Sequence, residues 1–121
     1  VQALYQLRMQ GWWPIVAHPE RYQNIADGEV VDEWRSVGAH TQCNSGSIVG
    51  RYGERAEKAI WNLLEKGAVD YLSSDYHARG RLAIADAKAA ICTAGGQDAF
   101  EKLTQVNPKL MLEGQEPQSL Q

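Results

Sequence analysis

Short apolar runs that end in histidine or aspartate most constrain how this chain folds. Residues 14–17 run directly into His18, and residues 69–72 are followed by Asp75 and His77. Strands that end in such side chains place candidate metal ligands at the carboxyl edge of a sheet, where α/β proteins bind their ligands. Asp75 and His77 are two residues apart, so both side chains leave one face of an extended segment. A carboxylate and imidazoles suit Mn, Fe or Zn, although a simple Asp–His hydrogen bond in a loop is an open alternative.

Helical patterns alternate with these runs, which predicts βαβ units and a parallel sheet. Strands are expected at residues 13–17, 39–43 and 69–73, and helices at residues 1–10, 27–37, 54–66, 82–93 and 97–105. Asp27 is the expected cap of the second helix. Asn107 and Pro108 are expected to end the last helix, leaving residues 109–112 as a short strand or turn. The chain is therefore predicted to be one α/β domain over residues 1–114, with about three parallel strands and a flexible tail at 115–121.

Composition excludes several classes of protein. The net charge is −3 over 121 residues and the basic residues are scattered, whereas nucleic-acid binding requires a clustered basic face. No run approaches the roughly 18 apolar residues of a membrane span, and the first ten residues do not resemble a signal peptide. Cys43 and Cys92 form no CxxC pair, which favours reduced thiols in a cytoplasmic protein.

Polar residues after the strands favour an anionic ligand. Arg21 is suited to hold a phosphate or carboxylate through two hydrogen bonds, although Glu20 and Arg21 also fit a surface pair. The loop that contains Ser47 offers hydroxyl and backbone N–H groups to an anion, or it simply caps the next helix. Arg79 and Arg81 follow His77 closely, and phosphate best matches a metal with arginine.

Other residues are expected to have structural roles. Pro19 favours an extended backbone at His18, which would aim the imidazole out of the strand end. His40 opens the second strand, at the opposite end from these loops, so it is interpreted as structural or exposed. Trp34 and Trp61 lie on apolar helix faces, which favours the core.

These segments together resemble the PHP (polymerase and histidinol phosphatase) superfamily. Within this superfamily they look like the bacterial capsular-polysaccharide, manganese-dependent protein-tyrosine phosphatases. The matching residues are Gly11, Pro14, Ala17, His18, Pro19, Glu20, Arg21 and Tyr22; Gln42, Asn44, Gly46, Ser47, Gly50 and Gly53; Ser74, Asp75, His77 and Arg81; and Asn107 with Pro108.

The resemblance implies part, about half, of a distorted, TIM-like β/α barrel. It implies that His18, Asp75 and His77 bind a divalent metal, with manganese expected first and zinc or iron as alternatives. It also implies that Arg21 and Arg81 hold the phosphate as catalytic residues, with Ser47 as a further anion-binding residue. Hydrolysis would proceed without a phospho-enzyme, and the family's remaining ligands would come from an amino-terminal half.

Two functions therefore stay open. The first is a metal-dependent phosphatase, acting on a phosphorylated protein or small phosphoester once the missing ligands are supplied. The second is a non-catalytic, oligomeric module that binds a metal or an anion. A homo-oligomer, most simply a dimer, is expected in both cases, because an incomplete sheet leaves edges and apolar surface uncovered.

Overall fold

The computed structural model contains a three-stranded parallel sheet and describes residues 1–22, 28–74 and 84–120. The strands are β1 (Ile15–Ala17), β2 (His40–Asn44) and β3 (Tyr71–Ser73), in the spatial order β1-β2-β3. Both pairs are parallel, and Gln42 of β2 lies opposite Ala17 on one side and Tyr71 on the other. The predicted α/β class with three parallel strands is confirmed.

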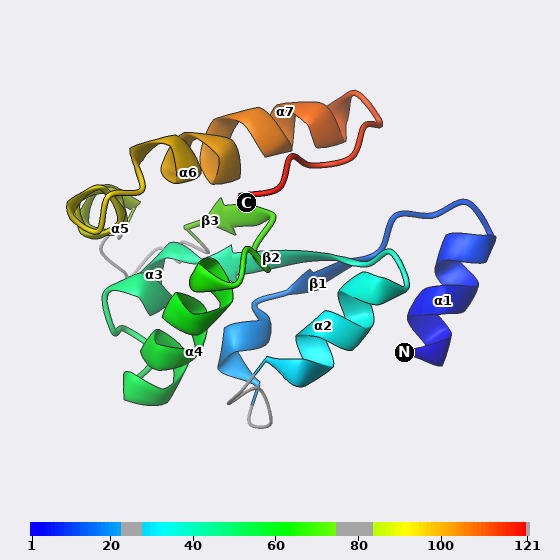
Figure 1. Cartoon of the computed structure of the whole chain (residues 1–121), viewed down its shortest axis with the longest axis horizontal. Helices are drawn as coiled ribbons and strands as arrows, with labels where there is room; N and C mark the ends of the chain where they lie inside the picture. Colours follow the sequence, from blue (N-terminus) through cyan, green and yellow to red (C-terminus); the bar gives the residue numbers. More distant parts are fainter. Residues whose placement is uncertain (23–27, 75–83, 121) are drawn as a thin grey trace.

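Helices flank this sheet on two sides (Figure 1). They are α1 (Gln2–Met9), α2 (Glu29–Ser36), α3 (Ser45–Ile48), α4 (Glu54–Glu65), α5 (Ile84–Thr93), α6 (Gln97–Glu101) and α7 (Asn107–Leu112), with a short 3₁₀ turn, η1 (Pro19–Arg21), and a π-helical turn, η2 (Lys102–Val106). In Figure 1 the sheet lies between α2 and α4 on one side and the run from α6 to α7 on the other, while α1 stands apart.

One face of the sheet packs into the core. Thr41, Cys43 and Leu72 share this face through the strand register, and all three are buried. Cys43 and Leu72 join a cluster with apolar residues of α2 and α4, including Val31 and Ile60. Side chains alternate between partly exposed and buried from His40 to Cys43, as expected for a strand with one core-facing side. Asn44 at the end of β2 is also buried.

The opposite face is more open. Ile15 on this face is 41% exposed. A cavity of about 260 Å³ lies over it, lined by Ile15, Gln42, Tyr71, Leu72, Ser73, Pro108 and Met111. The face thus combines polar side chains near the strand ends with an apolar hollow between the strands and α7.

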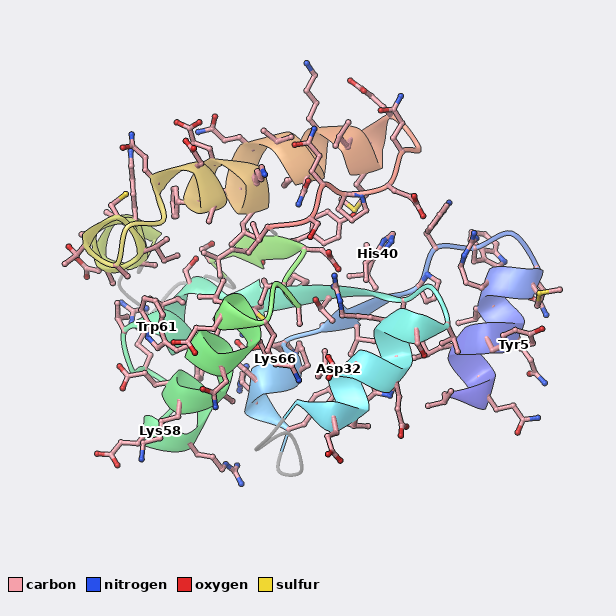
Figure 2. All side chains as sticks on the ribbon, viewed as in Figure 1. Tyr5, Asp32, His40, Lys58, Trp61 and Lys66 are labelled. Atoms are coloured by element: carbon pink, nitrogen blue, oxygen red, sulfur yellow. The ribbon has the colours of Figure 1, made fainter. Side chains whose placement is uncertain are left out.

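A partly buried ion pair lies at the amino end of the sheet. Asp70 is 3% exposed and its carboxylate accepts hydrogen bonds from Arg35 (2.5 Å) and the Thr41 amide (2.8 Å). Arg35 also donates to the Gly67 carbonyl. On the surface, Lys66, the residue that follows α4, pairs with Asp32 of α2 at 2.7 Å (Figure 2). These contacts join α2 to the strands and to α4.

The final helical run continues through Pro108, which corrects the expected break at residues 107–108. The Asn107 N–H donates to the Lys102 carbonyl, five residues earlier. This wider turn explains how the helix tolerates a ring that lacks an N–H and normally clashes with the preceding turn. Residues 109–112 are accordingly helical rather than a strand or turn.

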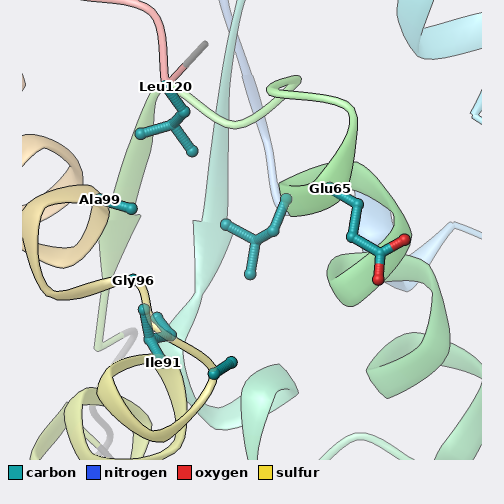
Figure 3. Close-up of a pocket in the computed structure, with 7 residues that line it drawn as sticks. Glu65, Ile91, Gly96, Ala99 and Leu120 are labelled. Atoms are coloured by element: carbon teal, nitrogen blue, oxygen red, sulfur yellow. The ribbon is translucent and has the colours of Figure 1, made fainter.

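The carboxyl tail folds back onto the domain. Asn107 is fully buried, and its amide donates to the Gln118 carbonyl and accepts from the Gln118 N–H at 2.7 Å. Leu120 packs against the core and borders a cavity of about 270 Å³ between α4, α5 and α6 (Figure 3). Residues 115–120 are therefore tied down, which corrects the prediction of a loose tail.

Element boundaries differ slightly from expectation. The helix expected at 27–37 begins after Gly28, whose φ of 77° suits glycine, and Asp27 lies outside the described residues. The first strand begins at Ile15 rather than at residue 13, and Trp13 stacks on His40 with ring centroids 5.1 Å apart. Over the described part of the chain, no helix combines the length and apolar character needed to cross a bilayer.

Candidate functional site

β1 ends in a sharp turn at His18. The His18 backbone lies in the left-handed region (φ 37°, ψ 57°) rather than the extended conformation expected before Pro19. Its N–H donates to the Gln42 carbonyl (2.6 Å) and side-chain oxygen (3.1 Å), and its carbonyl accepts from the Arg21 N–H. These bonds hold a conformation that is costly for a residue with a Cβ.

The His18 imidazole has the character of a ligand donor. Its Nδ1 is buried, and no described residue hydrogen-bonds to it. The Tyr22 ring contacts the imidazole edge-on at 5.9 Å. A neutral imidazole nitrogen is a common metal ligand, so a buried donor atom at a strand end fits a divalent ion.

The Glu20 carboxylate holds the same turn through hydrogen bonds to residues at and after the end of β2. It is 1% exposed, and its Oε2 accepts hydrogen bonds from the Asn44 N–H (2.9 Å) and the Ser47 hydroxyl (2.6 Å). The interpretation of Glu20 and Arg21 as a surface pair is therefore wrong for Glu20. This buried carboxylate with two donors links the turn after β1 to the end of β2 and to α3.

The Ser47 hydroxyl belongs to this internal link. Ser47 is fully buried and its hydroxyl donates to Glu20. The described geometry therefore lends no support to the prediction that Ser47 binds an external anion.

Arg21 lies next to Glu20 but faces outward. Its guanidinium carbon lies 4.0 Å from the centre of the Tyr52 ring. A guanidinium stacked on an aromatic face keeps its N–H donors in its own plane, directed past the ring. Tyr52 was not among the predicted site residues, because nothing local to it indicates a contact with Arg21.

Gln42 connects the ends of all three strands. Its Oε1 accepts from His18 after β1, and its Nε2 donates to Ser73 at the end of β3 (2.5 Å). The same amide nitrogen also lies within hydrogen-bond distance of the Cys43 carbonyl and Asn44 Oδ1 in β2. The sequence pattern marked Gln42 only as part of a family motif, since this role depends on strand register.

Cys43 lies directly under this region and is completely buried. Burial, followed by the neighbouring Glu20 carboxylate, raises the pKa of its thiol well above the ordinary value. Cys43 is therefore a neutral core residue, and it is not part of a disulfide among the described residues.

The other predicted site residues, Asp75, His77 and Arg81, lie outside the described residues. β3 ends at Ser73, two positions before Asp75. Within residues 1–22, 28–74 and 84–120, no three His, Cys, Asp or Glu side chains gather to hold a metal ion. The described half of the candidate site consists of His18, Arg21 and the residues that hold them.

His40 lies at the other end of β2. It stacks on Trp13 and makes an edge contact with Tyr71 at 6.4 Å. Burial lowers the pKa of His40, and the nearby Asp70 carboxylate opposes this shift. The interpretation of His40 as structural agrees with these contacts.

Comparison with known proteins identifies the lineage of this arrangement. A family model described as "Capsular polysaccharide synthesis, CpsB/CapC" matches residues 1–113. The chain belongs to the CpsB/CapC family. The sequence-based resemblance to the capsular-polysaccharide phosphatases is thereby confirmed.

Curated relatives in the CpsB/CapC family carry phosphatase names. The chain is 31% identical over 77 residues to tyrosine-protein phosphatase YwqE of Bacillus subtilis, covering 63% of this chain and 30% of that protein. It is 35% identical over 81 residues to tyrosine-protein phosphatase CpsB of Streptococcus agalactiae, covering 62% and 33% respectively. It is also 30% identical over 77 residues to a putative tyrosine-protein phosphatase CapC of Staphylococcus aureus, covering 63% and 30%.

A solved structure shares the fold. It comes from work on YwqE of Bacillus subtilis and CpsB of Streptococcus pneumoniae, described as metal-dependent tyrosine phosphatases. The TM-score is 0.88 at 26% identity, and the match covers 98% of this chain and 49% of that one. The chain thus corresponds to about half of that CpsB/CapC-type structure.

Proposed function

We propose that this chain carries part of a metal-dependent phosphatase site of CpsB/CapC type. In this proposal His18, Asp75 and His77 are metal ligands, and Arg21 and Arg81 hold the phosphate. The substrate is a phosphate monoester, with protein phosphotyrosine favoured by the names of the relatives. Turnover requires further ligands, which another polypeptide segment would supply.

One observation carries the proposal. The buried Nδ1 of His18, to which no described residue hydrogen-bonds, lies in the same tight turn as Arg21. The turn itself is held by Gln42 and Glu20. His18 and Arg21, three positions apart, thus lie together at the carboxyl edge of a parallel sheet, where such folds bind ligands, and this supports their proposed roles as metal ligand and phosphate-binding residue.

His18 and Arg21 would have different roles in the proposed reaction. A bound divalent ion would supply Lewis-acid activation of water and of the phosphoryl group. His18 would hold that ion through a ring nitrogen, and Arg21 would orient the phosphate through its planar donors. Tyr52 would limit the directions that the Arg21 side chain can take.

A second function is supported by the same geometry. A module with three candidate ligands and two arginines would bind a metal or phosphate without hydrolysing the ester. The short match to the relatives, 30–33% of their length, favours weak turnover by the chain alone. In this second case a homodimer with partial metal occupancy is proposed, with manganese as the first metal to test and a cytoplasmic location.

Activity and anion binding together test the proposal. With p-nitrophenyl phosphate and manganese, turnover is expected to be very low, and any turnover should disappear in His18→Ala. Calorimetric titration with inorganic phosphate should show weaker binding in Arg21→Met than in Arg55→Met, an exposed arginine of α4. Phosphate binding without turnover would favour the second function, whereas equal phosphate binding by both arginine variants would contradict the assignment of Arg21.

A further inference from the structure

We infer that Gln42 is the positioning residue that sets the His18 turn relative to the end of β3. The inference rests on the proposed function, in which His18 and the segment after β3 contribute to one metal site. It concerns a side chain with no proposed ligand role of its own. Gln42 would act by fixing where the ligand-bearing strand ends lie.

The hydrogen-bond chemistry fixes the orientation of the Gln42 amide. The His18 N–H is a donor, so the atom facing it must be the amide oxygen, and the two are 3.1 Å apart. The amide NH₂ then faces Ser73 Oγ at 2.5 Å and the Cys43 carbonyl at 2.9 Å, both of which accept hydrogen bonds. Every described partner matches this single orientation.

The strand order explains why a side chain that contacts both outer strands can position their ends. β1 and β3 each pair with β2, so their ends are separated by two strand spacings, about 10 Å. The backbone hydrogen bonds between the strands do not determine how the chain turns after the last paired residue of β1 or of β3. Gln42 lies on the central strand and reaches both neighbours through one side chain.

The Gln42 side chain also stabilises the strained backbone of His18. A left-handed conformation at a residue with a Cβ persists only where surrounding contacts determine it. The second acceptor supplied by Gln42 strengthens the hold on the His18 N–H beyond the ladder bond to the Gln42 carbonyl. Without it, we expect the turn to relax toward the extended form that Pro19 favours.

Metal titration tests this role against a purely structural one. Co²⁺ is the probe, because its visible spectrum reports both affinity and ligand geometry. Gln42→Leu removes both polar ends of the amide, Gln42→Glu removes only the donor, and Ser73→Ala removes the acceptor on β3. Thr41→Val is the matched control, since it breaks a buried bond to Ala68 on the same strand but on the core face.

The expected result is a selective loss of metal affinity. Gln42→Leu should weaken Co²⁺ binding by about tenfold or more, the usual range for residues that orient metal ligands. Gln42→Glu and Ser73→Ala should show the same direction, and their double variant should lose less than the two losses combined because they share one interaction. Thr41→Val should lower the urea midpoint while keeping the wild-type Co²⁺ affinity and spectrum. Wild-type affinity in Gln42→Leu would overturn the inference.

A metal-free measurement separates this inference from the proposed function. If the wild-type chain binds no Co²⁺, the proposed function fails, and exchange of the His18 amide decides the role of Gln42. Loss of one hydrogen bond predicts exchange about fivefold faster in Gln42→Leu than in Thr41→Val, corresponding to about 1 kcal/mol. Equal exchange rates in these two variants would contradict the positioning role.

Discussion

Buried polar side chains determine the local geometry where the strands end. His18 adopts a left-handed backbone, Glu20 lies beneath it as a buried carboxylate, and Gln42 spans the sheet above the core. Each makes hydrogen bonds with a different part of the chain. The position of the candidate ligand His18 therefore depends on residues that contact no ligand themselves.

The Glu20 carboxylate should contribute strongly to stability. Glu20→Ala leaves the Asn44 N–H and the Ser47 hydroxyl without their acceptor, so we expect it to lower the free energy of unfolding by about 3 kcal/mol. Glu20→Gln keeps one carbonyl oxygen and should cost about 1 kcal/mol. Urea denaturation measures both values. The exposed Glu33→Ala is the control and should change stability by less than about 0.5 kcal/mol; an equal effect at both sites would refute the role of Glu20.

His40 should make stability depend on pH below neutrality. Its pKa is lowered in the folded state, mainly by burial, so the folded protein binds a proton less readily than the unfolded chain. The stability that comes with a neutral His40 is fully present above the pKa of the unfolded chain, about 6.5. It is lost as the pH falls below that value toward the lower pKa of the folded state. Urea midpoints from pH 8 to 5 should fall less steeply in His40→Gln than in the wild type. Parallel curves would show that His40 does not carry this dependence.

At the scale of elements, the sequence predicted the strands and long helices better than it predicted the chain's end. The patterns for β2 and α4 were nearly correct because they depend on local alternation and an apolar stripe. The expected break at Pro108 failed because the π-helical turn before it changes the hydrogen-bond spacing. The Glu20 and Gln42 links could not be predicted, since they join segments more than 20 residues apart.

Asn107 should hold the final helix and the tail together. Its amide donates to the Asp70 carbonyl at 2.8 Å and makes reciprocal hydrogen bonds with Gln118. We expect Asn107→Ala to cost about 2–4 kcal/mol, because it leaves several buried polar groups unsatisfied. Exchange of the Gln118 amide should also accelerate. Gln105→Ala, an exposed position on the same helical run, is the control, and unchanged Gln118 exchange in Asn107→Ala would contradict this role.

At the level of the whole molecule, the sheet has one well-packed face and a second face that is only partly covered, where Tyr71 is buried and Ile15 is 41% exposed. Large apolar side chains are also exposed on α1 and before β1, among them Met9 at 69% and Trp12 at 65%. The CpsB/CapC match explains the lineage but covers only about half of the solved relative. The sequence motif therefore predicted the family to which the chain belongs.

The exposed apolar surface predicts self-association. Light scattering at micromolar concentration should give the mass of a dimer, because exposed apolar patches and unpaired strand edges favour association. Trp12→Ser should shift the mass toward that of a monomer, while Lys58→Ser on the exposed side of α4 should not. A monomer at all concentrations would refute this prediction.

Metal binding by two histidine variants tests whether the end of β1 is part of a metal site. Equilibrium dialysis against manganese, followed by elemental analysis, compares the wild type with His18→Ala and with His40→Ala as the matched control. We expect weak or partial occupancy in the wild type and unchanged occupancy in His40→Ala. His18→Ala should bind manganese at least about tenfold more weakly, since a lost ligand weakens a site at least as much as a lost supporting residue. Equal binding by His18→Ala and the wild type would contradict the assignment of the β1 end as part of a metal site.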